Sequence, residues 1–376
     1  MFQTPLRALG SLRPNVPPVI LAASSVSTVV FTATPFLITE LSEQHGVSTG
    51  RVGLISSLQL AGFVLASWGA GRVLRPRRRL MVIAVIIGMV ANLVSGFVNF
   101  ELLLPVRFIN GIALGAIAWL AWAEVFGDDE RIGDIAVIGP IVGTVMSPIV
   151  GTFGDRFGPD HLFMALSALH LLPLMFVSSS RLSSPDRVQR TRHCASRSAV
   201  VAMTALGLMT LGGSGVFVFA NSIGRGPVGM SALTVSLLFS VNSIAGIPSS
   251  RYRGERTNAA LWVSCTGISA FLIAVVHHPL AFVIGMALWG FSFWMAVPAA
   301  FSVLAANSNY PAERAGDAQA YMALGRVIGP IVGGVLYDVD PWALGLAGSG
   351  VIFVSAITLG ILGRQQRVSG LAAATP

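Results

Sequence analysis

The chain contains about twelve stretches of roughly 20 apolar residues, separated by short hydrophilic loops. Residues 80–99, 162–179, 259–276 and 344–362 are four examples, and none of them contains Asp, Glu, Lys or Arg. The hydrocarbon core of a bilayer is about 30 Å thick, and a helix needs about 20 residues to cross it. The pattern therefore predicts an all-α integral membrane protein with twelve transmembrane helices.

Composition excludes several other classes of protein. Only 11% of the 376 residues are charged, against about 25% in soluble domains. The net charge of +8 does not indicate a nucleic-acid partner, because the arginines occupy separate short loops and not one continuous patch. Cys194 and Cys265 lack the paired spacing of a disulfide or metal site. We therefore expect no metal and no other cofactor.

The distribution of arginine predicts the orientation in the membrane. We expect helices at residues 18–41, 52–74, 80–99, 102–124, 133–153, 162–179, 199–222, 231–249, 259–276, 280–305, 317–337 and 344–363. The loops on one side then hold Arg7, Arg13, Arg75, Arg77, Arg78, Arg79, Arg181, Arg187, Arg190, Arg192, Arg197, Arg251, Arg253, Arg256, Arg364 and Arg367. The opposite loops hold Arg51, Arg156 and Arg225. Because cytoplasmic loops are rich in Lys and Arg, we expect a plasma (inner) membrane protein with both termini in the cytoplasm.

A long hydrophilic segment divides the chain into two similar halves. Residues 181–198 are rich in Ser, Pro and Arg and lack apolar periodicity, which is typical of a linker. We expect six-helix bundles at 1–180 and 199–376. A run of Gly, Ser and Pro at 143–152 recurs 182 residues later at 325–334. Two parallel six-helix repeats are a known transporter architecture.

Arg107 is the most unusual residue, because it lies inside the predicted fourth helix. An arginine in a bilayer costs several kcal/mol, so it normally faces protein or a water-filled space. The alternative is that Arg107 extends to the nearby membrane surface. Gly111 and Gly115 follow on the same helical face, where small residues permit close helix packing.

These motifs resemble those of the major facilitator superfamily. Arg107, Gly111 and Gly115 are similar to its fourth-helix motif, and Gly69, Arg77 and Arg78 match its loop between the second and third helices, although Val73 and Pro76 depart from that pattern. The run with Gly329, Pro330, Gly333 and Gly334 matches a pattern common in the superfamily, and the run with Pro148 resembles its antiporter motif. The resemblance implies alternating access, with these residues as packing and bending elements.

Further polar and aromatic residues in the spans are candidates for substrate binding or coupling. Arg107 is the first candidate and Arg326 the second, with Asn110, Gln59 and Trp289 as possible lining residues. Glu40, Glu124 and His170 are the candidate proton carriers, although no carboxylate lies at mid-depth in any predicted span. Each amide and His170 could equally be a helix-packing group with satisfied hydrogen bonds.

Two charged loops precede the predicted fifth and eleventh helices. The first holds Asp128, Asp129, Glu130, Arg131 and Asp134, and the second holds Glu313, Arg314 and Asp317. We expect salt bridges between these loops and the basic cytoplasmic loops in one state of the protein.

The function expected from these observations is secondary transport, and not an enzymatic reaction. We favour efflux of a drug-like compound or metabolite by proton antiport, with an anionic or neutral substrate. The alternative is an uptake permease, a symporter or facilitator, for a small organic acid or other nutrient, and a remote alternative is a receptor without transport. The expected partners are a small molecule, protons and the lipid bilayer, with no nucleic acid, and we expect a monomer.

Overall fold

The computed structural model describes residues 16–125, 129–179, 193–252, 254, 256 and 258–374. This part of the chain is helical and contains no strand. The helices are α2 (Pro18–His45), α3 (Thr49–Val52), α4 (Leu54–Val73), α5 (Arg78–Ser95), α6 (Phe100–Val125), α7 (Asp129–Leu169), α8 (Leu171–Met175), the 3-10 turn η1 (Val177–Ser179), α9 (Arg197–Val218), α10 (Ala220–Arg225), α11 (Ala232–Ser250), α12 (Ala259–Ala274), α13 (Pro279–Ala306), α14 (Pro311–Val339) and α15 (Pro341–Ala374).

These helices form the predicted twelve crossings. Ten segments of the described chain are long and apolar enough to span a membrane. One of them, in α7, crosses twice, because Gly158 has a φ of 80° and reverses the helix direction just before Pro159. The shorter apolar helix α12 supplies the remaining crossing. The fold is therefore all-α, as expected.

Several predicted boundaries differ from the structure. Helix α2 continues to His45 and not to residue 41, and α14 begins at Pro311 and not at residue 317. The predicted fifth and sixth helices are both present within α7, and the break between them is a sharp turn at Gly158 in place of a longer loop. The last helix, α15, continues to Ala374 and not to residue 363, since the polar residues after Gly363 extend the helix beyond the apolar stretch. Hydropathy marks the end of the membrane-embedded part of a helix and not the end of the helix itself.

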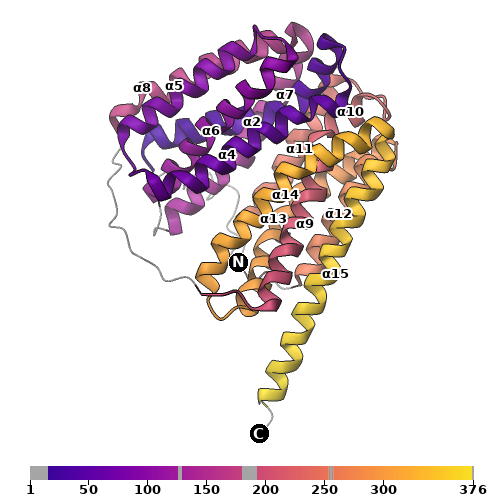
Figure 1. Ribbon diagram of the computed structural model, residues 1–376. Helices are drawn as coiled ribbons and strands as arrows, with labels where there is room; N and C mark the ends of the chain where they lie inside the picture. The colour runs from indigo at the N-terminus through magenta and orange to yellow at the C-terminus, as the bar shows by residue number, and fades with distance from the viewer. Residues whose placement is uncertain are drawn as a thin grey trace.

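The helices form two six-helix bundles (Figure 1). In Figure 1 the bundle of α2–α8 lies above that of α9–α15, and the two meet near α10 and diverge toward the ends joined by the linker. We call the end that carries Ser179 and His193 the linker end, and the end that carries Arg225 the far end. Near mid-depth, Ser240 of α11 donates a hydrogen bond to the carbonyl oxygen of Thr144 in α7, at 2.7 Å.

Close helix contact inside each bundle depends on glycine. A Cβ on Gly111 would lie 2.0 Å from the carbonyl oxygen of Gln59, so α6 can touch α4 only with glycine there. The second bundle repeats this contact, since a Cβ on Gly290 would lie 1.9 Å from the carbonyl oxygen of Asn242. Other glycines of the predicted motifs make similar contacts inside a bundle, namely Gly115 with Phe63, Gly329 with Leu211 and Gly333 with Gly215. Gly334 contacts Gly50 and so makes a close contact between the two bundles. Gly69 has no such neighbour among the described residues.

Replacing Gly111 with alanine is expected to destabilise the first bundle. The new methyl group must push α6 away from α4, and overpacking of this kind costs about 1–3 kcal/mol. Thermal unfolding in detergent would measure the loss. Gly350→Ala is the matched control, because a Cβ there meets no atom within 4 Å. An equal Tm for the two variants would contradict this account of the α4–α6 contact.

Candidate functional site

Arg107 is enclosed within the first bundle. Its side chain is 1% exposed. Its Nη2 donates to Oε1 of Gln59 at 2.5 Å and to Oδ1 of Asn110 at 3.1 Å, and its Nη1 donates to Oδ1 of Asn92 at 2.8 Å. The guanidinium also lies over the ring of Phe163, 5.1 Å from its centroid. Arg107 therefore does not extend to the membrane surface, and helices α4, α5 and α6 share its hydrogen bonds.

All of these acceptors are neutral. The positive charge of Arg107 is thus stabilised by amide oxygens and by the face of an aromatic ring, and its described partners include no carboxylate. His170 lies beside this cluster. Its Nδ1 is bonded to the carbonyl oxygen of Leu166. Its Nε2 lies against Gly88, whose carbonyl oxygen accepts a hydrogen bond from Asn110. Sequence analysis predicted a role for Arg107, Asn110, Gln59 and His170 separately, and the structure brings the four together.

Arg326 has a different environment. It lies at the middle of α14 and is partly exposed. Among the residues that the structure describes, none forms a hydrogen bond or an ion pair with Arg326. A guanidinium at this depth without a protein partner is a candidate for contact with an anionic ligand.

The helical register shows which way Arg326 faces. The exposed residues Leu324 and Val335 mark the lipid-facing side of α14. Since an α-helix turns about 100° per residue, Arg326 lies on the opposite side. Gly325 packs against α9, and Gly334 packs against Gly50 of the first bundle. Arg326 therefore lies on the interior side of α14. This side is between the face of α14 that contacts α9 and the face that contacts the first bundle.

An aromatic layer lies between Arg326 and the far end. Phe36 of α2 contacts Phe239 of α11, with ring centroids 5.0 Å apart, and Phe217 of α9 contacts both Phe239 and Trp289, at 5.3 Å each. Phe217 lies six residues beyond Leu211, which adjoins Gly325, and this places it about 9 Å farther along α9. The layer joins α2 to three helices of the second bundle. The predicted lining residue Trp289 belongs to it.

Polar contacts join the two bundles at the far end. Arg225 of α10 forms ion pairs with Glu40 of α2 and with Asp155 of α7, the latter at 3.1 Å. Asp338 of α14 accepts hydrogen bonds from the backbone N–H of Gly50, at 2.8 Å, and from the hydroxyl of Ser48, at 2.7 Å. These contacts hold the far end closed in this conformation.

Two further hydrogen bonds join the bundles at a depth between these ion pairs and the aromatic layer. Thr39 of α2 forms hydrogen bonds with the hydroxyl of Ser222 and with the side-chain amide of Asn221, both at 2.8 Å. The hydrogen bonds and ion pairs described between the bundles thus lie at the far end or near mid-depth. Glu40 belongs to this closure, whereas Glu124 lies at the linker end of α6.

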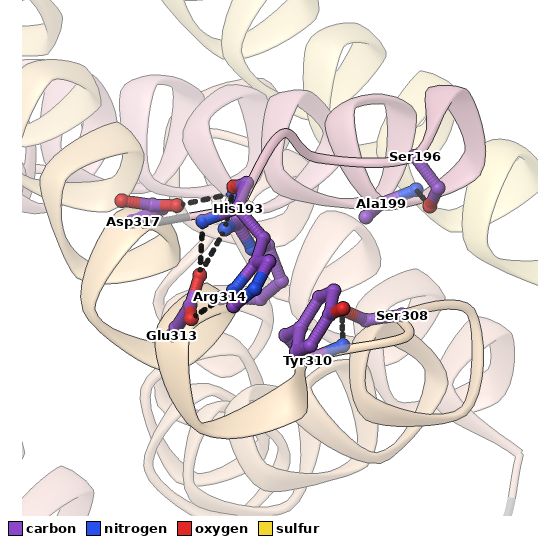
Figure 2. Close-up of polar contacts among 8 residues, drawn as sticks. All are labelled: His193, Ser196, Ala199, Ser308, Tyr310, Glu313, Arg314 and Asp317. Carbon is purple, nitrogen blue, oxygen red and sulfur yellow. Dashed lines mark hydrogen bonds and ion pairs between the residues drawn. The ribbon is translucent and has the colours of Figure 1, made fainter. Parts of the chain in front are cut away.

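At the linker end, the chain entering the second bundle is fastened to α14 (Figure 2). The Nδ1 of His193 lies 2.9 Å from Oε1 of Glu313, and its ring stacks on Tyr310 with centroids 3.8 Å apart. Arg314 donates to the carbonyl oxygen of His193 at 2.6 Å and pairs with Asp317 at 2.8 Å. Glu313, Arg314 and Asp317 were expected in a loop, but they lie in the first two turns of α14, where Glu313 and Arg314 contact the linker residue His193.

Some predicted contacts lie outside the described residues. The side chains of Asp128, Asp129, Glu130, Arg131 and Asp134 are among them, so salt bridges from the first charged loop to the basic loops stay a prediction. Arg78 is the first residue of α5 and Arg77 directly precedes it, and both are exposed. Pro148 and Pro330 lie inside α7 and α14.

The comparison with known families identifies the chain. The sequence profile described as Major Facilitator Superfamily matches residues 19–326. The chain belongs to this superfamily. Its transporter fold and its motifs therefore agree with the resemblance seen in the sequence. The comparison with curated protein sequences gave no match.

Solved structures of superfamily fold are similar over almost the whole chain. The human organic anion transporter MFSD10 (TETRAN) has a TM-score of 0.64 and 18% identity, covering 95% of this chain and 100% of that one. A bacterial homolog of the human lysosomal transporter Spinster, inward-facing and unoccupied, has a TM-score of 0.65 and 14% identity, with 97% of each chain covered. A POT family transporter in complex with a thioalcohol-conjugated peptide has a TM-score of 0.73 and 10% identity, with 96% of each covered.

Sequence reasoning missed the residues that close the far end. Arg225 was interpreted only as a marker of orientation, and Asp155, Asp338 and Thr39 were not singled out. Their partners are more than 65 residues away along the chain, and for Arg225 and Glu40 the separation is 185 residues. No local pattern reports such a pairing. One signal was present in the sequence: Arg225, Glu40 and Asp155 carry opposite charges and lie at helix ends predicted on the same side of the membrane.

The two intramembrane arginines are expected to differ in their effect on stability. Arg107→Ala leaves several buried acceptors without a donor, at a cost of about 1–3 kcal/mol for each group left unsatisfied. Arg326→Ala removes no described hydrogen bond and should leave the Tm unchanged. Thermal unfolding in detergent compares the two directly. A larger loss from Arg326→Ala would contradict the environments described here.

Proposed function

We propose that the protein transports a small organic anion by alternating access, with Arg326 as the cationic contact for the substrate. The observation that carries this proposal is the partner-free guanidinium at mid-depth on the interior side of α14. An anion beside it would supply the hydrogen-bond acceptors and the negative charge that the described protein does not. Arg107, by contrast, already has neutral acceptors and is shielded from any ligand in this conformation.

The closed far end supports access from the linker end. A substrate entering from the linker end would meet Arg326 before the aromatic layer of Phe36, Phe217, Phe239 and Trp289. With the termini in the cytoplasm, as the arginine distribution predicts, this is the inward-open state. The fold neighbour named as an organic anion transporter is in keeping with this substrate class.

Replacing Arg326 with glutamine is expected to reduce anion transport about 10- to 100-fold, because a hydrogen bond to a charged group contributes about 1.5–3 kcal/mol. The measurement is flux into proteoliposomes of a panel of monocarboxylates, dicarboxylates and aromatic sulfonates. Arg326→Lys keeps the charge and should retain part of the flux. Leu324→Ala, two residues away on the lipid-facing side, is the matched control.

Two outcomes would count against this substrate class. One is a panel in which only neutral or cationic compounds are transported. The other is undiminished anion flux by Arg326→Gln protein that is correctly folded, as shown by an unchanged Tm.

We further propose that transport is export driven by proton antiport, with Glu40 as the proton-binding group. Glu40 and Asp155 share the single cation Arg225. Opening the far end must separate these groups, because Arg225 lies in one bundle and both carboxylates in the other. A proton that binds Glu40 at that stage would remove the unpaired negative charge. The resemblance of the run around Pro148 to an antiporter motif supports the same direction.

Glu40→Gln is expected to abolish the stimulation of flux by an imposed pH gradient while leaving exchange of substrate across the membrane intact. A glutamine cannot take up and release a proton in this range of pH. Glu43→Gln is the matched control, because Glu43 is an exposed carboxylate one turn away on the same helix. Flux of the unmodified protein that ignores the gradient would favour the second candidate in its facilitator form, an uptake permease for a small organic acid that is not coupled to protons.

A further inference from the structure

A groove lies on the second bundle, on the side of α12, α13 and α15 at the linker end. Its volume is about 840 Å³, within the range of about 300–1,000 Å³ that is usual for small-molecule sites. Helix α12 packs against both α13 and α15. Small and apolar side chains line the groove, among them Ala259, Ala260, Ala299, Val303, Ala356 and Ile357. It is therefore shaped for a hydrocarbon chain and is separate from Arg326.

The mouth of the groove is cationic. Arg256, in the segment between α11 and α12, and Arg364, near the end of α15, both line it. Asn258, Ser264 and Ser302 are the other polar residues lining it, and the described lining contains no aspartate or glutamate. Arg364 is exposed. The charge at the mouth is therefore positive and is not neutralised by the described lining residues.

Arg256 lacks a complete set of hydrogen bonds. Its Nη2 donates to the carbonyl oxygens of Ser249 and Tyr252, at 3.0 and 2.8 Å, and so caps the end of α11. Its Nε is buried and has no partner among the described residues. Burial lowers the pKa of Arg256 from its usual value, which reflects the cost of a cation with little compensation. An anionic group at the mouth would offset that cost.

The groove also opens toward the lipid. Ile357 and Ile361 of α15 line it and are 63% and 52% exposed. A ligand here would thus have an apolar part between the helices and an anionic part near Arg256 and Arg364. Basic pockets between transmembrane helices bind anionic lipid headgroups in this way.

We propose that this groove binds an anionic phospholipid, with the phosphate near Arg256 and Arg364 and an acyl chain along Ala260, Ala299 and Ile357. The lipid would hold α12, α13 and α15 together at the linker end, where α13 and α15 have little direct contact. This binding does not depend on the transported substrate or on proton coupling.

Native mass spectrometry of the purified protein tests the proposal, with phosphatidylglycerol and phosphatidylcholine of identical chains added separately. Phosphatidylglycerol should bind more tightly. Arg364→Gln should weaken its binding about fivefold, because a basic residue near a membrane surface contributes about 1 kcal/mol. Binding of phosphatidylcholine should weaken less, because its choline cation offsets the charge of its phosphate. Ser302→Phe, which fills the groove at an exposed position, should weaken the binding of both lipids.

Arg79→Gln is the matched control, since it removes an exposed arginine from α5 in the other bundle. Equal binding of the two lipids, or equal loss in Arg79→Gln and Arg364→Gln, would overturn the proposal. Glycerol phosphate carries the headgroup charge without acyl chains and should not displace the lipid. Displacement by glycerol phosphate would show that the arginines bind a soluble anion, and would also overturn it.

Discussion

A guanidinium inside a bilayer needs acceptors for its N–H groups, because the hydrocarbon offers none. The two intramembrane arginines of this protein differ in how far the described residues meet that requirement. Arg107 has protein acceptors on α4, α5 and α6, so that one charged side chain ties three helices of the first bundle together. Arg326 has no described protein acceptor and lies on the interior side of α14. The first arrangement ties the fold together, and the second is the basis of the proposed contact with an anionic substrate.

The far end is closed by three successive layers of different chemistry. Ion pairs around Arg225 are outermost, hydrogen bonds around Thr39 follow, and the aromatic contact between Phe36 and Phe239 lies nearest to mid-depth. Polar contacts are stronger in apolar surroundings than in water. Separation of the bundles at this end must break all three layers. A group that neutralises one of the carboxylates would lower the cost of the outermost step.

Hydropathy and the distribution of arginine were sufficient to predict twelve crossings in two bundles, because the thickness of the membrane sets the length of every helix. The same reasoning left open whether Arg107 faces protein or the membrane surface, and it could not distinguish the surroundings of Arg107 from those of Arg326. The distinction depends on neighbours such as Asn92, which is 15 residues from Arg107 and on another helix. The contacts of Arg225 were missed because they join residues from opposite halves of the chain. Distances between bundles are not encoded in local periodicity.

The hydrogen bond from Ser240 to Thr144 has a mechanical consequence. It joins α11 to α7 close to mid-depth. Under the proposed motion the two bundles rotate as rigid bodies, and this hydrogen bond lies near the rotation axis. Residues near the rotation axis move little, whereas residues at the two ends of each bundle move far and in opposite directions. Arg326 is at a similar depth, and the ion pairs of Arg225 are at one extremity. A ligand at Arg326 would therefore keep nearly constant surroundings while each opening of one end closes the other.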